Sequence, residues 1–446
     1  MLSHQKSKWC TAMALAIGTL FTPIGAHANG RFPVADQLIV DPKDPAHLVL
    51  RTTYGVLSTD DITKGFSWTC EANVGYGGAQ DPAIGILSDG TVLAGVFEGL
   101  AVTHDRGCSW AFVGDPLKDE YTIDVSVHHD DPSRAVAITS TGTDIGFHVI
   151  LAETNDNGVS WSQAGTAILS DMIALTVDVA PSNPDRIYVS GVVGKAYAPA
   201  IERSDDRGKT WKRTYFEATF AKDTPFIAAI DPLNPDRVYL RMNGDPSDHL
   251  LVSDDGAATW TAVYTGMADL LGFALAPDGS RVAVGGPSDG IRLANTTDFA
   301  FAQTSSLATR CLTWSAQGLY ACANQFADGF TLGLSQDEGK TFTPLYNLKD
   351  ICPLKCPDGA PGTAVCSKSW PALAATLGIE PTACGGSAMS GSSSSSSGGS
   401  SAPPPPANGG DCGCRFAGQN EQGYTSFAVM AFALVCRGRR NRVSMK

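Results

Sequence analysis

The chain has 446 residues, of which 47 are glycines and only 17% are charged, and this length allows one large domain or two to three small ones. The formal net charge is −13, and basic side chains gather at both ends, so the middle of the chain is more acidic still. Such a surface repels the phosphates of DNA and RNA, which argues against a nucleic-acid partner. Short runs of Val, Ile, Tyr and Phe alternate with clusters of Gly, Asp, Asn and Pro, which predicts an all-β fold.

Residues 1–28 have the three parts of a secretory signal peptide. Lys6 and Lys8 precede an apolar run from Trp9 to Ile24, and Ala26-His27-Ala28 forms a small-x-small cleavage site. The apolar run is shorter than the roughly 20 residues that a membrane span needs. We therefore expect cleavage after Ala28 and export of the mature chain, rather than an N-terminal membrane anchor.

One short pattern recurs through residues 29–348. Its best copies are THDRGCSW around Asp105, TNDNGVSW around Asp156, SDDRGKTW around Asp206 and SQDEGKTF around Asp337. Two altered copies surround Asp60 and Asp255, and a decayed copy surrounds Asp298. The seven aspartates lie 39 to 51 residues apart, a period that matches the four-stranded blade of a β-propeller.

The residue types of the pattern favour a turn over a catalytic or metal-binding loop. The Asp carboxylate can accept hydrogen bonds from the next backbone N–H groups, and the glycine allows a positive φ. An aromatic residue then opens the next strand and is expected to point inward. The glycines are Gly107, Gly158, Gly208 and Gly339, and the tryptophans are Trp68, Trp110, Trp161, Trp211 and Trp260. The acidic residues are not spaced as in a calcium loop.

This S/T-x-D-x-G-x-T/S-W pattern resembles the Asp-box, or BNR, repeat of bacterial sialidases, xyloglucan-degrading hydrolases, sortilin-type receptors and photosystem assembly propellers. The resemblance covers residues 31–348, and with seven copies it implies a seven-bladed β-propeller of four-stranded antiparallel blades. In that family the repeat is a structural turn at the rim of the blade, away from the central binding face. The sequence leaves open whether the first and last strands share one blade or merely abut.

The cysteines predict disulfides. Cys10 belongs to the signal peptide and Cys412, Cys414 and Cys436 to the tail, which leaves eight, an even number in an exported chain. Cys311 and Cys322 flank a hairpin symmetrically, which predicts a cross-strand disulfide. A separate Cys-rich segment, 349–385, holds four cysteines, which could form disulfides in three different pairings. The four are Cys352, Cys356, Cys366 and Cys384. Cys70 and Cys108 remain and are a candidate pair. No second pair of cysteines or histidines completes a zinc site with CPLKC, and we predict no metal.

The C-terminal region reads as a tether followed by a sorting signal. Residues 386–410 are rich in Gly, Ser and Pro and are expected to form a linker without a core. Residues 411–446 contain a Cys pair, a short apolar run and a terminal Arg cluster. This order is similar to the MYXO-CTERM tail of myxobacterial exported proteins. The resemblance implies processing and lipidation at Cys414 and association with the membrane at the cell surface.

No motif in the chain identifies an enzyme. A sialidase needs three converging arginines and six blades, whereas the arginines here are either inside the repeats or have no motif that places them. Those without a motif are Arg51, Arg203, Arg213, Arg241, Arg292 and Arg310. Acidic residues outside the turns leave a glycoside hydrolase or lyase as the alternative function; they are Asp124, Asp171, Asp178, Asp223 and Asp269. Asp124 and Asp178 occupy matching places in successive blades, which favours a structural role.

We therefore expect a non-catalytic propeller, displayed at the cell surface, that binds a protein or a polysaccharide. Loops that differ between blades are the expected contact sites, and the three longest lie between the second and third strands of a blade. Phe147, Tyr197 and His249 lie on these loops and are our candidate binding residues. We expect no cofactor and a monomeric propeller.

Overall fold

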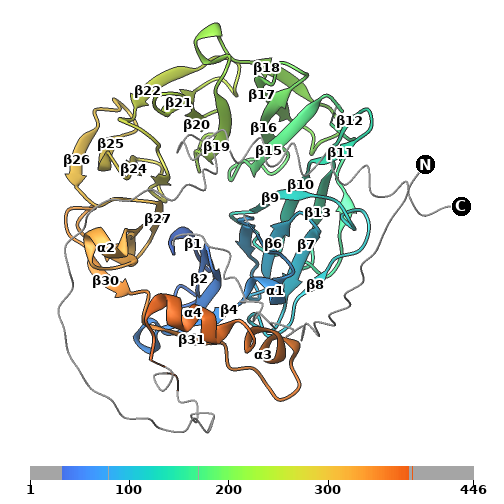
Figure 1. Cartoon of the computed structure of the whole chain (residues 1–446). Helices are drawn as coiled ribbons and strands as arrows, with labels where there is room; N and C mark the ends of the chain where they lie inside the picture. The colour runs from blue at the N-terminus through green and yellow to red at the C-terminus, as the bar shows by residue number, and fades with distance from the viewer. Residues whose placement is uncertain (1–32, 79, 169, 381–383, 385–446) are drawn as a thin grey trace, which may run out of the picture.

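The computed structural model describes residues 33–78, 80–168, 170–380 and 384 of the chain. They form seven four-stranded antiparallel sheets arranged as blades around a central channel (Figure 1), which confirms the seven-bladed propeller. The segments predicted as signal peptide, linker and sorting tail with Cys414 lie outside the described residues.

Each blade is built from consecutive strands, the first innermost and the fourth outermost. Blade 1 comprises β1 (Ala35–Val40), β2 (Leu48–Thr52), β3 (Gly55–Thr59) and β4 (Phe66–Thr69), and blade 2 comprises β5 (Ala83–Ile86), β6 (Val92–Val96), β7 (Gly99–Thr103) and β8 (Ala111–Phe112). Blade 3 comprises β9 (Thr122–Val127), β10 (Ala135–Thr139), β13 (Leu151–Thr154) and β14 (Ser162–Gln163), and blade 4 comprises β15 (Met172–Val179), β16 (Ile187–Val193), β17 (Ala198–Ser204) and β18 (Lys212–Tyr215). Blade 5 comprises β19 (Thr224–Ile230), β20 (Val238–Asn243), β21 (His249–Ser253) and β22 (Thr261–Thr265), and blade 6 comprises β23 (Gly272–Leu275), β24 (Arg281–Gly286), β25 (Gly290–Asn295) and β26 (Ala302–Ser305). Blade 7 comprises β27 (Cys311–Ser315), β28 (Gly318–Cys322), β29 (Leu332–Ser335) and β30 (Thr343–Tyr346). A small hairpin of β11 (Thr141–Thr143) and β12 (Gly146–His148) projects from blade 3.

The hydrophobic core lies mostly in the seams between neighbouring blades. One cluster joins Leu151 of blade 3 to Val189 of blade 4, and another joins Tyr188 of blade 4 to Leu240 of blade 5. Alternate strand residues point to opposite faces of a sheet, so a central strand buried on both faces reads as a continuous apolar run.

The tryptophans of the repeat only partly meet the expectation that they point inward. Trp68 is buried, whereas Trp110, Trp161, Trp211 and Trp260 are half-buried. Each of these four packs at the edge of a cluster that spans two blades. They open the outermost strand, which has solvent on its outer side, so the ring covers the seam instead of filling it.

The recurring segments are turns between the third and fourth strands. In SDDRGKTW, Asp206 accepts hydrogen bonds from the Thr210 N–H (2.8 Å), the Thr210 hydroxyl (2.7 Å) and the Ser204 hydroxyl (2.9 Å). Gly208, at φ 79°, donates its N–H to the Ser204 hydroxyl oxygen at 2.8 Å. The turns around Asp105, Asp156, Asp255 and Asp337 have the same contacts.

In blade 1 the assignment of the turn to Asp60 is wrong, because Asp61 holds the corresponding place. Asp61 donates its N–H to Thr59 two residues earlier and accepts from the Thr63 N–H, and so caps a short 3-10 helix, η1 (Ile62–Lys64). Asp60 instead pairs with Arg106 of the next blade at 3.0 Å. The relation between a hydroxyl and an Asp two residues later defines the turn, and the sequence offers this spacing twice, as Ser58–Asp60 and as Thr59–Asp61.

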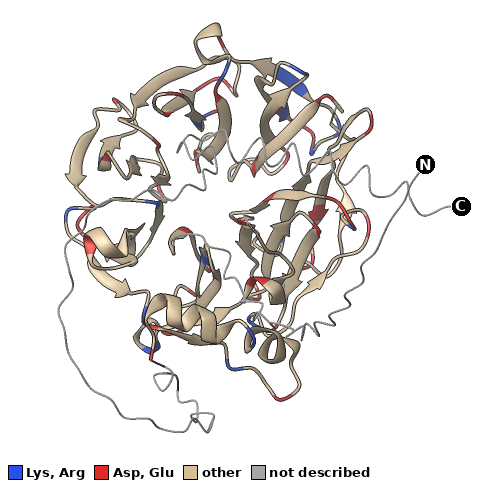
Figure 2. Ribbon diagram, viewed as in Figure 1, with Lys and Arg blue, Asp and Glu red and all other residues tan. Residues whose placement is uncertain are grey.

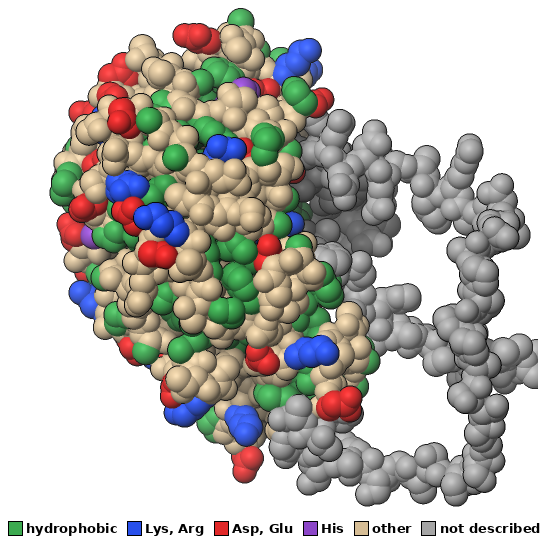
Figure 3. Space-filling model, turned by 90° about the vertical axis from the view of Figure 1, so that its left-hand side faces the viewer, with side chains coloured by type: hydrophobic (Ala, Val, Ile, Leu, Met, Phe, Trp, Pro, Cys, Tyr) green, Lys and Arg blue, Asp and Glu red, His purple; other side chains and the backbone are tan. Residues whose placement is uncertain are grey.

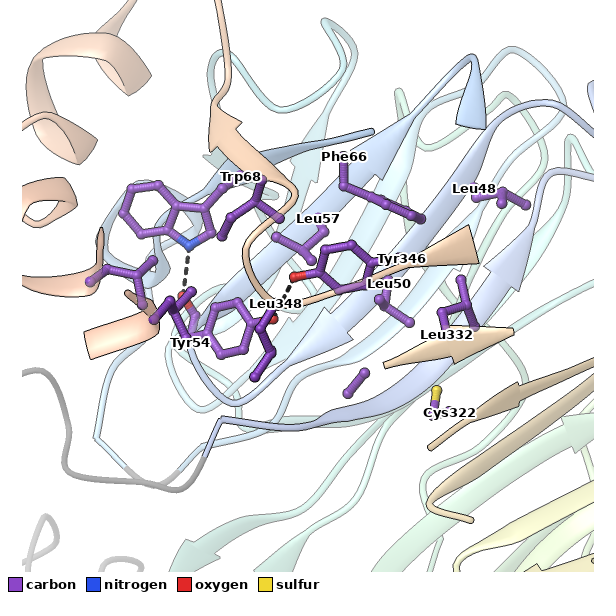
Figure 4. Close-up of a cluster of buried hydrophobic side chains, with 14 of the residues drawn as sticks. Leu48, Leu50, Tyr54, Leu57, Phe66, Trp68, Cys322, Leu332, Tyr346 and Leu348 are labelled. Carbon is purple, nitrogen blue, oxygen red and sulfur yellow. Dashed lines mark hydrogen bonds between the residues drawn. The ribbon is translucent and has the colours of Figure 1, made fainter. Parts of the chain in front are cut away.

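Blades 7 and 1 each have four strands of their own and meet through side-chain contacts, and the chain after blade 7 adds a fifth strand to the sheet of blade 1. Arg310 of blade 7 pairs with Asp36 of blade 1 at 2.8 Å, and the Thr313 hydroxyl donates to the Leu38 carbonyl oxygen at 2.8 Å. Figure 4 shows the buried cluster at this junction, in which side chains of blade 1 meet Tyr346 and Leu348.

The segment after blade 7 returns to blade 1. Its strand β31 (Ile351–Pro353) lies parallel to β4 as a fifth strand, and α3 (Pro361–Cys366) and α4 (Trp370–Leu377) follow it. In Figure 1 these helices lie beside β4 and near α1 (Glu71–Val74), while α2 (Gln325–Asp328) belongs to blade 7 and η2 (Ala218–Phe220) precedes blade 5.

Two cysteine expectations need correction. Cys70 does not pair with Cys108, and the Cys-rich segment is not a separate unit. Cys366 is bonded to Cys70 and Cys356 to Cys108, so two disulfides attach the segment to blades 1 and 2. The reason is spatial, because β31 brings the segment beside β4, after which Cys70 follows directly. The other two bonds are Cys311–Cys322, across the β27–β28 hairpin, and Cys352–Cys384.

Candidate functional site

The two faces of the ring differ in kind. One, the turn face, carries the repeated turns and the loops between first and second strands. The other, the loop face, carries the loops between second and third strands and the connections from one blade to the next. Loops that vary between blades therefore share the loop face. Charged residues of both signs are spread around the whole ring (Figure 2), and on the side turned to the viewer in Figure 3 apolar side chains are dispersed among polar ones.

The three candidate contact residues all come from loop-face segments, but they are not equally accessible. Tyr197 is 49% exposed at the tip of the β16–β17 hairpin, where its φ is 51°. Phe147 is half-buried and packs against the cluster of Ile173, Leu175 and Val192. His249 lies edge-on to Phe220, with ring centroids 5.5 Å apart, and its Nδ1 is 3.0 Å from the Thr265 hydroxyl.

Other large apolar side chains are exposed in loop-face segments. Ile145 at the tip of the β11–β12 hairpin is 91% exposed, Tyr215 at the end of β18 is 55% exposed and Met267, in the connection to blade 6, is 61% exposed. These residues and Tyr197 belong to blades 3 and 4 and to the connection that leaves blade 5. We call Ile145, Tyr197, Tyr215 and Met267 the loop-face set.

A cavity of about 420 Å³ occupies one end of the central channel. Its lining comes from the inner strands of five blades and from β20, β21 and β24, and is mostly apolar, with Leu38, Phe226, Phe273 and Leu312 among the lining residues. In β1, β23 and β27 the residues that line the cavity lie in the N-terminal half of the strand. Each inner strand begins at the loop face. The cavity therefore lies at the loop-face end of the channel, where propellers and barrels commonly hold ligands.

Arg241 brings a positive charge to this cavity. It stands opposite Phe226 in the β19–β20 ladder, and its guanidinium carbon is 4.9 Å from the centre of the Phe226 ring. Its Nη1 donates to the Leu270 carbonyl oxygen at 2.8 Å. Burial lowers the pKa of Arg241, while the charges of Asp248 and Asp269 oppose this shift. An arginine nevertheless stays protonated at neutral pH.

The other arginines are largely committed to ion pairs. Of those that no motif places, Arg203, Arg213, Arg292 and Arg310 each have a carboxylate oxygen within 4.0 Å. Among the described residues, Arg51 and Arg241 have no such partner, and Arg51 donates to the Pro82 carbonyl oxygen at 3.2 Å. Of these two, only Arg241 lines the cavity. Sequence reasoning had no motif for it, because its role depends on the ladder that places it over Phe226.

Asp124 and Asp178 form a pair of acids on neighbouring inner strands. Asp124 Oδ2 accepts from the Val177 N–H of β15 at 2.9 Å, and Asp178 Oδ1 accepts from the Ser126 hydroxyl of β9 at 3.0 Å. Burial, and then the charge of Asp178, raises the pKa of Asp124 to about 8. Burial also raises the pKa of Asp178 to about 7. Both residues are half-buried.

These acids take part in a recurring link between blades. An inner strand leaves N–H groups unpaired on its channel edge, and a side chain from the preceding blade accepts one of them. Thr176 accepts from the Ile227 N–H at 3.0 Å in the same way as Asp124 accepts from Val177. This role makes the pair part of the ring, and the two acids lie on adjacent strands, not across an open cleft.

The remaining acids outside the turns are also accounted for. Asp171 pairs with Arg213 at 3.0 Å, Asp223 lies near His249 and has a pKa raised by burial, and the charge of Asp269 acts on Arg241. Across the part of the chain that the structure describes, no group of three or more His, Cys, Asp or Glu side chains could hold a metal ion. Within those same residues, no helix is long and apolar enough to cross a membrane.

Comparison with known proteins supports the fold. No protein-family profile and no curated protein matches the chain. Among solved structures, hydrazine synthase of Kuenenia stuttgartiensis has a TM-score of 0.51 at 11% identity, over 70% of this chain and 99% of that one. A GH74 enzyme of Niastella koreensis (TM-score 0.44, 16% identity) and the GH74 xyloglucanase of Xanthomonas campestris (0.34, 16%) are matched over 70% and 69% of this chain. The match spans 44% and 63% of those GH74 chains, less than two thirds of either. At such identities the likeness concerns the fold alone.

Proposed function

We propose that this chain is a non-catalytic propeller, displayed at the cell surface, whose loop face binds a protein or a polysaccharide. The loop-face set carries the proposal. Its four side chains are 49% to 91% exposed, and they come from segments that do not repeat between blades. Tyrosine combines a large apolar face with a hydroxyl, which suits contact with sugar rings or with a protein surface.

The repeated turns, in this proposal, are Asp-boxes in the BNR sense and serve the fold. Their acids are consumed by hydrogen bonds within the turn, and basic residues at the starts of second strands fix neighbouring turns. Arg237 holds Asp254 at 2.5 Å, and Arg281 of blade 6 holds Glu338 of blade 7 at 2.7 Å. These contacts occupy polar groups of the turn face that a ligand would otherwise meet.

Surface display rests on the two ends of the chain and on the disulfides. Four disulfides among the described residues favour an oxidising compartment. The proposal assigns export to residues 1–28 and retention to the 411–446 tail through Cys414. Surface labelling of cells that express the full chain or its Cys414→Ala variant tests this part. Equal surface retention of the two would defeat the assigned role of the tail.

The binding proposal is tested with the purified propeller and a panel of immobilised xyloglucan, polygalacturonate and dextran, together with capture of surface proteins. The variant Tyr197→Ser/Tyr215→Ser removes two members of the loop-face set. Val159→Ser/Leu233→Ser is the matched control, because these residues are 74% and 76% exposed on the turn face. We expect the first variant to lose binding at least about tenfold and the control to retain it. Loss in both variants, or in neither, would contradict a loop-face site.

Glycoside cleavage is the alternative, and the Asp124–Asp178 pair is the observation that keeps it in view. A glycosidase uses two carboxyl groups, and burial raises the pKa of both of these acids, but they lie on adjacent inner strands and not across an open cleft. The same panel therefore includes an assay for new reducing ends. We expect none to be released, and release that disappears in Asp124→Asn would replace the binding proposal with an enzymatic one.

A further inference from the structure

The cavity at the loop-face end of the channel has a single charge that the protein does not pair. Its two charged lining residues are Arg241 and Asp36. Asp36 is paired with Arg310 at 2.8 Å and so contributes little net charge to the cavity. Arg241 has no carboxylate oxygen of a described residue within 4.0 Å.

Asp248 and Asp269 act on Arg241 through their charges, but neither has a carboxylate oxygen paired with it within 4.0 Å. Asp248 is fully buried, and its oxygens accept from the Leu270 N–H at 2.9 Å, the Gly244 N–H at 3.2 Å and the Asn243 side-chain amide at 3.0 Å. It attracts Arg241 through space, but its hydrogen-bonding capacity is spent on the loop-face backbone. A guanidinium has five N–H donors in a planar fork, and Arg241 uses Nη1 on Leu270.

The position of the guanidinium is fixed from two sides. The Phe226 ring lies under it at 4.9 Å, and the Leu270 carbonyl holds one edge. A fork held in this way can meet a carboxylate with two parallel hydrogen bonds without first losing side-chain freedom. The rest of the lining offers apolar contact, since the polar side chains of Gln37 and Thr176 are already bonded to neighbouring strands.

From these contacts we infer that the cavity binds a small organic monocarboxylate with an apolar body, whose carboxylate meets Arg241. About 420 Å³ is the size of a small-molecule site, and a single unpaired cation matches one negative charge. The apolar body contacts the side chains of Leu38, Phe273 and Leu312. This site lies in the channel and does not depend on what the exposed loop-face set binds.

Isothermal titration of the purified protein with phenylacetate, and separately with its neutral analogue phenylacetamide, tests the inference. We expect saturable binding of phenylacetate that is about tenfold or more tighter than that of the amide, because a charge-assisted bidentate contact is lost in the amide. No saturable binding of phenylacetate, or equal binding of acid and amide, would overturn the inference.

Arg241→Met removes the charge while keeping most of the side-chain volume, and we expect it to abolish the preference for the acid. Arg203→Met is the control, because Arg203 lies near the turn face and is held by Asp205 at 2.9 Å and by the Gly256 carbonyl oxygen. An unchanged acid preference in Arg241→Met would overturn the site. If that variant does not fold, as judged by near-UV circular dichroism, Arg241→Lys with its single-point charge takes its place, and it should weaken phenylacetate binding but keep a preference for the acid over the amide.

Discussion

The hydroxyl of Tyr54 in blade 1 lies 2.8 Å from the hydroxyl of Tyr346 in blade 7, 292 residues later in the chain. Both rings are buried, and the bond stands inside the cluster that closes the propeller (Figure 4). Phe66 packs edge-on against Tyr346, with ring centroids 5.1 Å apart. Closure therefore depends on side-chain contacts between blades 7 and 1, together with β31 and the disulfides Cys70–Cys366 and Cys108–Cys356, which attach the chain after blade 7 to blades 1 and 2.

Replacing both of these tyrosines should cost less stability than the sum of the two single replacements. In Tyr346→Phe the Tyr54 hydroxyl loses its buried partner, and we expect the free energy of unfolding to fall by about 1–3 kcal/mol. In Tyr54→Phe/Tyr346→Phe no hydroxyl is left without its partner, so the loss should be less than the sum of the single losses. Urea unfolding of the wild type, both single variants and the double variant measures the coupling. Additive losses would mean that the two hydroxyls do not act as a pair.

The long-range disulfides should stabilise the ring more than the hairpin disulfide does. Cys70–Cys366 spans 296 residues, whereas Cys311–Cys322 spans 11. A cross-link over a longer loop restricts the unfolded chain more, with typical contributions of about 2–4 kcal/mol. We therefore expect Cys70→Ala/Cys366→Ala to lower stability more than Cys311→Ala/Cys322→Ala, which deletes the same atoms.

Hydrogen exchange locates the effect of that change. In Cys70→Ala/Cys366→Ala, amides of β31, α3 and α4 should exchange faster than in the wild type, while those of blades 4 and 5 should not. Uniformly faster exchange in every blade would contradict a local role for this disulfide in holding the returning segment.

The repeating part of this fold could be predicted from the sequence because each blade restates the same local chemistry. A hydroxyl, an Asp two residues later and a Gly after it are enough to identify the turn, and the spacing of turns gives the number of blades. The one misplaced turn shows the limit of this approach. Asp60 and Asp61 are adjacent, and only the hydrogen bond from the Asp61 N–H to Thr59 distinguishes them.

Features without a repeat could not be predicted in this way. Nothing in the sequence around Cys366 shows that the chain returns to blade 1, because the pairing with Cys70 depends on a parallel strand, β31, that follows blade 7 in the chain and pairs with β4. The position of Arg241 in the cavity could not be predicted from the sequence either. RMNG looks like one more strand end, and Arg241 acquires its place only from the register that sets it opposite Phe226.

The turn acids should affect stability in proportion to how many hydrogen bonds they accept. Asp206 accepts from both the N–H and the hydroxyl of Thr210, while Asp298 in the decayed copy accepts from the Ala300 N–H at 3.1 Å. We expect Asp206→Ala to lower the Tm by a few degrees and Asp298→Ala to leave it nearly unchanged. Differential scanning calorimetry compares the two. Equal effects would show that the intact turn adds nothing beyond the strands that it joins.

The channel acids should make the propeller less stable as the pH rises toward 8. The pKa values of Asp124 and Asp178 are about 8 and about 7 in the folded chain, above the value of roughly 3.9 of an unfolded aspartate. Between these limits the folded state binds more protons, so the free energy of unfolding decreases as the pH rises. The stabilisation of the folded state by these two protonated acids is fully present below about pH 4 and is lost as the pH rises through their folded pKa values. The positive charge of Arg51 near Asp124 reduces this effect without reversing it.

Asp124→Asn keeps an oxygen that can accept the Val177 N–H but has no proton to lose. We therefore expect thermal unfolding at intervals from pH 5 to pH 9 to show a steep fall in Tm for the wild type and a flatter one for this variant, with a difference of about 1 kcal/mol or more in stability accumulated over that range. Asp171→Asn serves as the control, because Asp171 is paired with Arg213 at the surface and should leave the pH slope as it is in the wild type. Parallel slopes for the wild type and Asp124→Asn would show that Asp124 is ionised throughout this range, and that its bond to β15 is the contact of a carboxylate, not of a carboxylic acid.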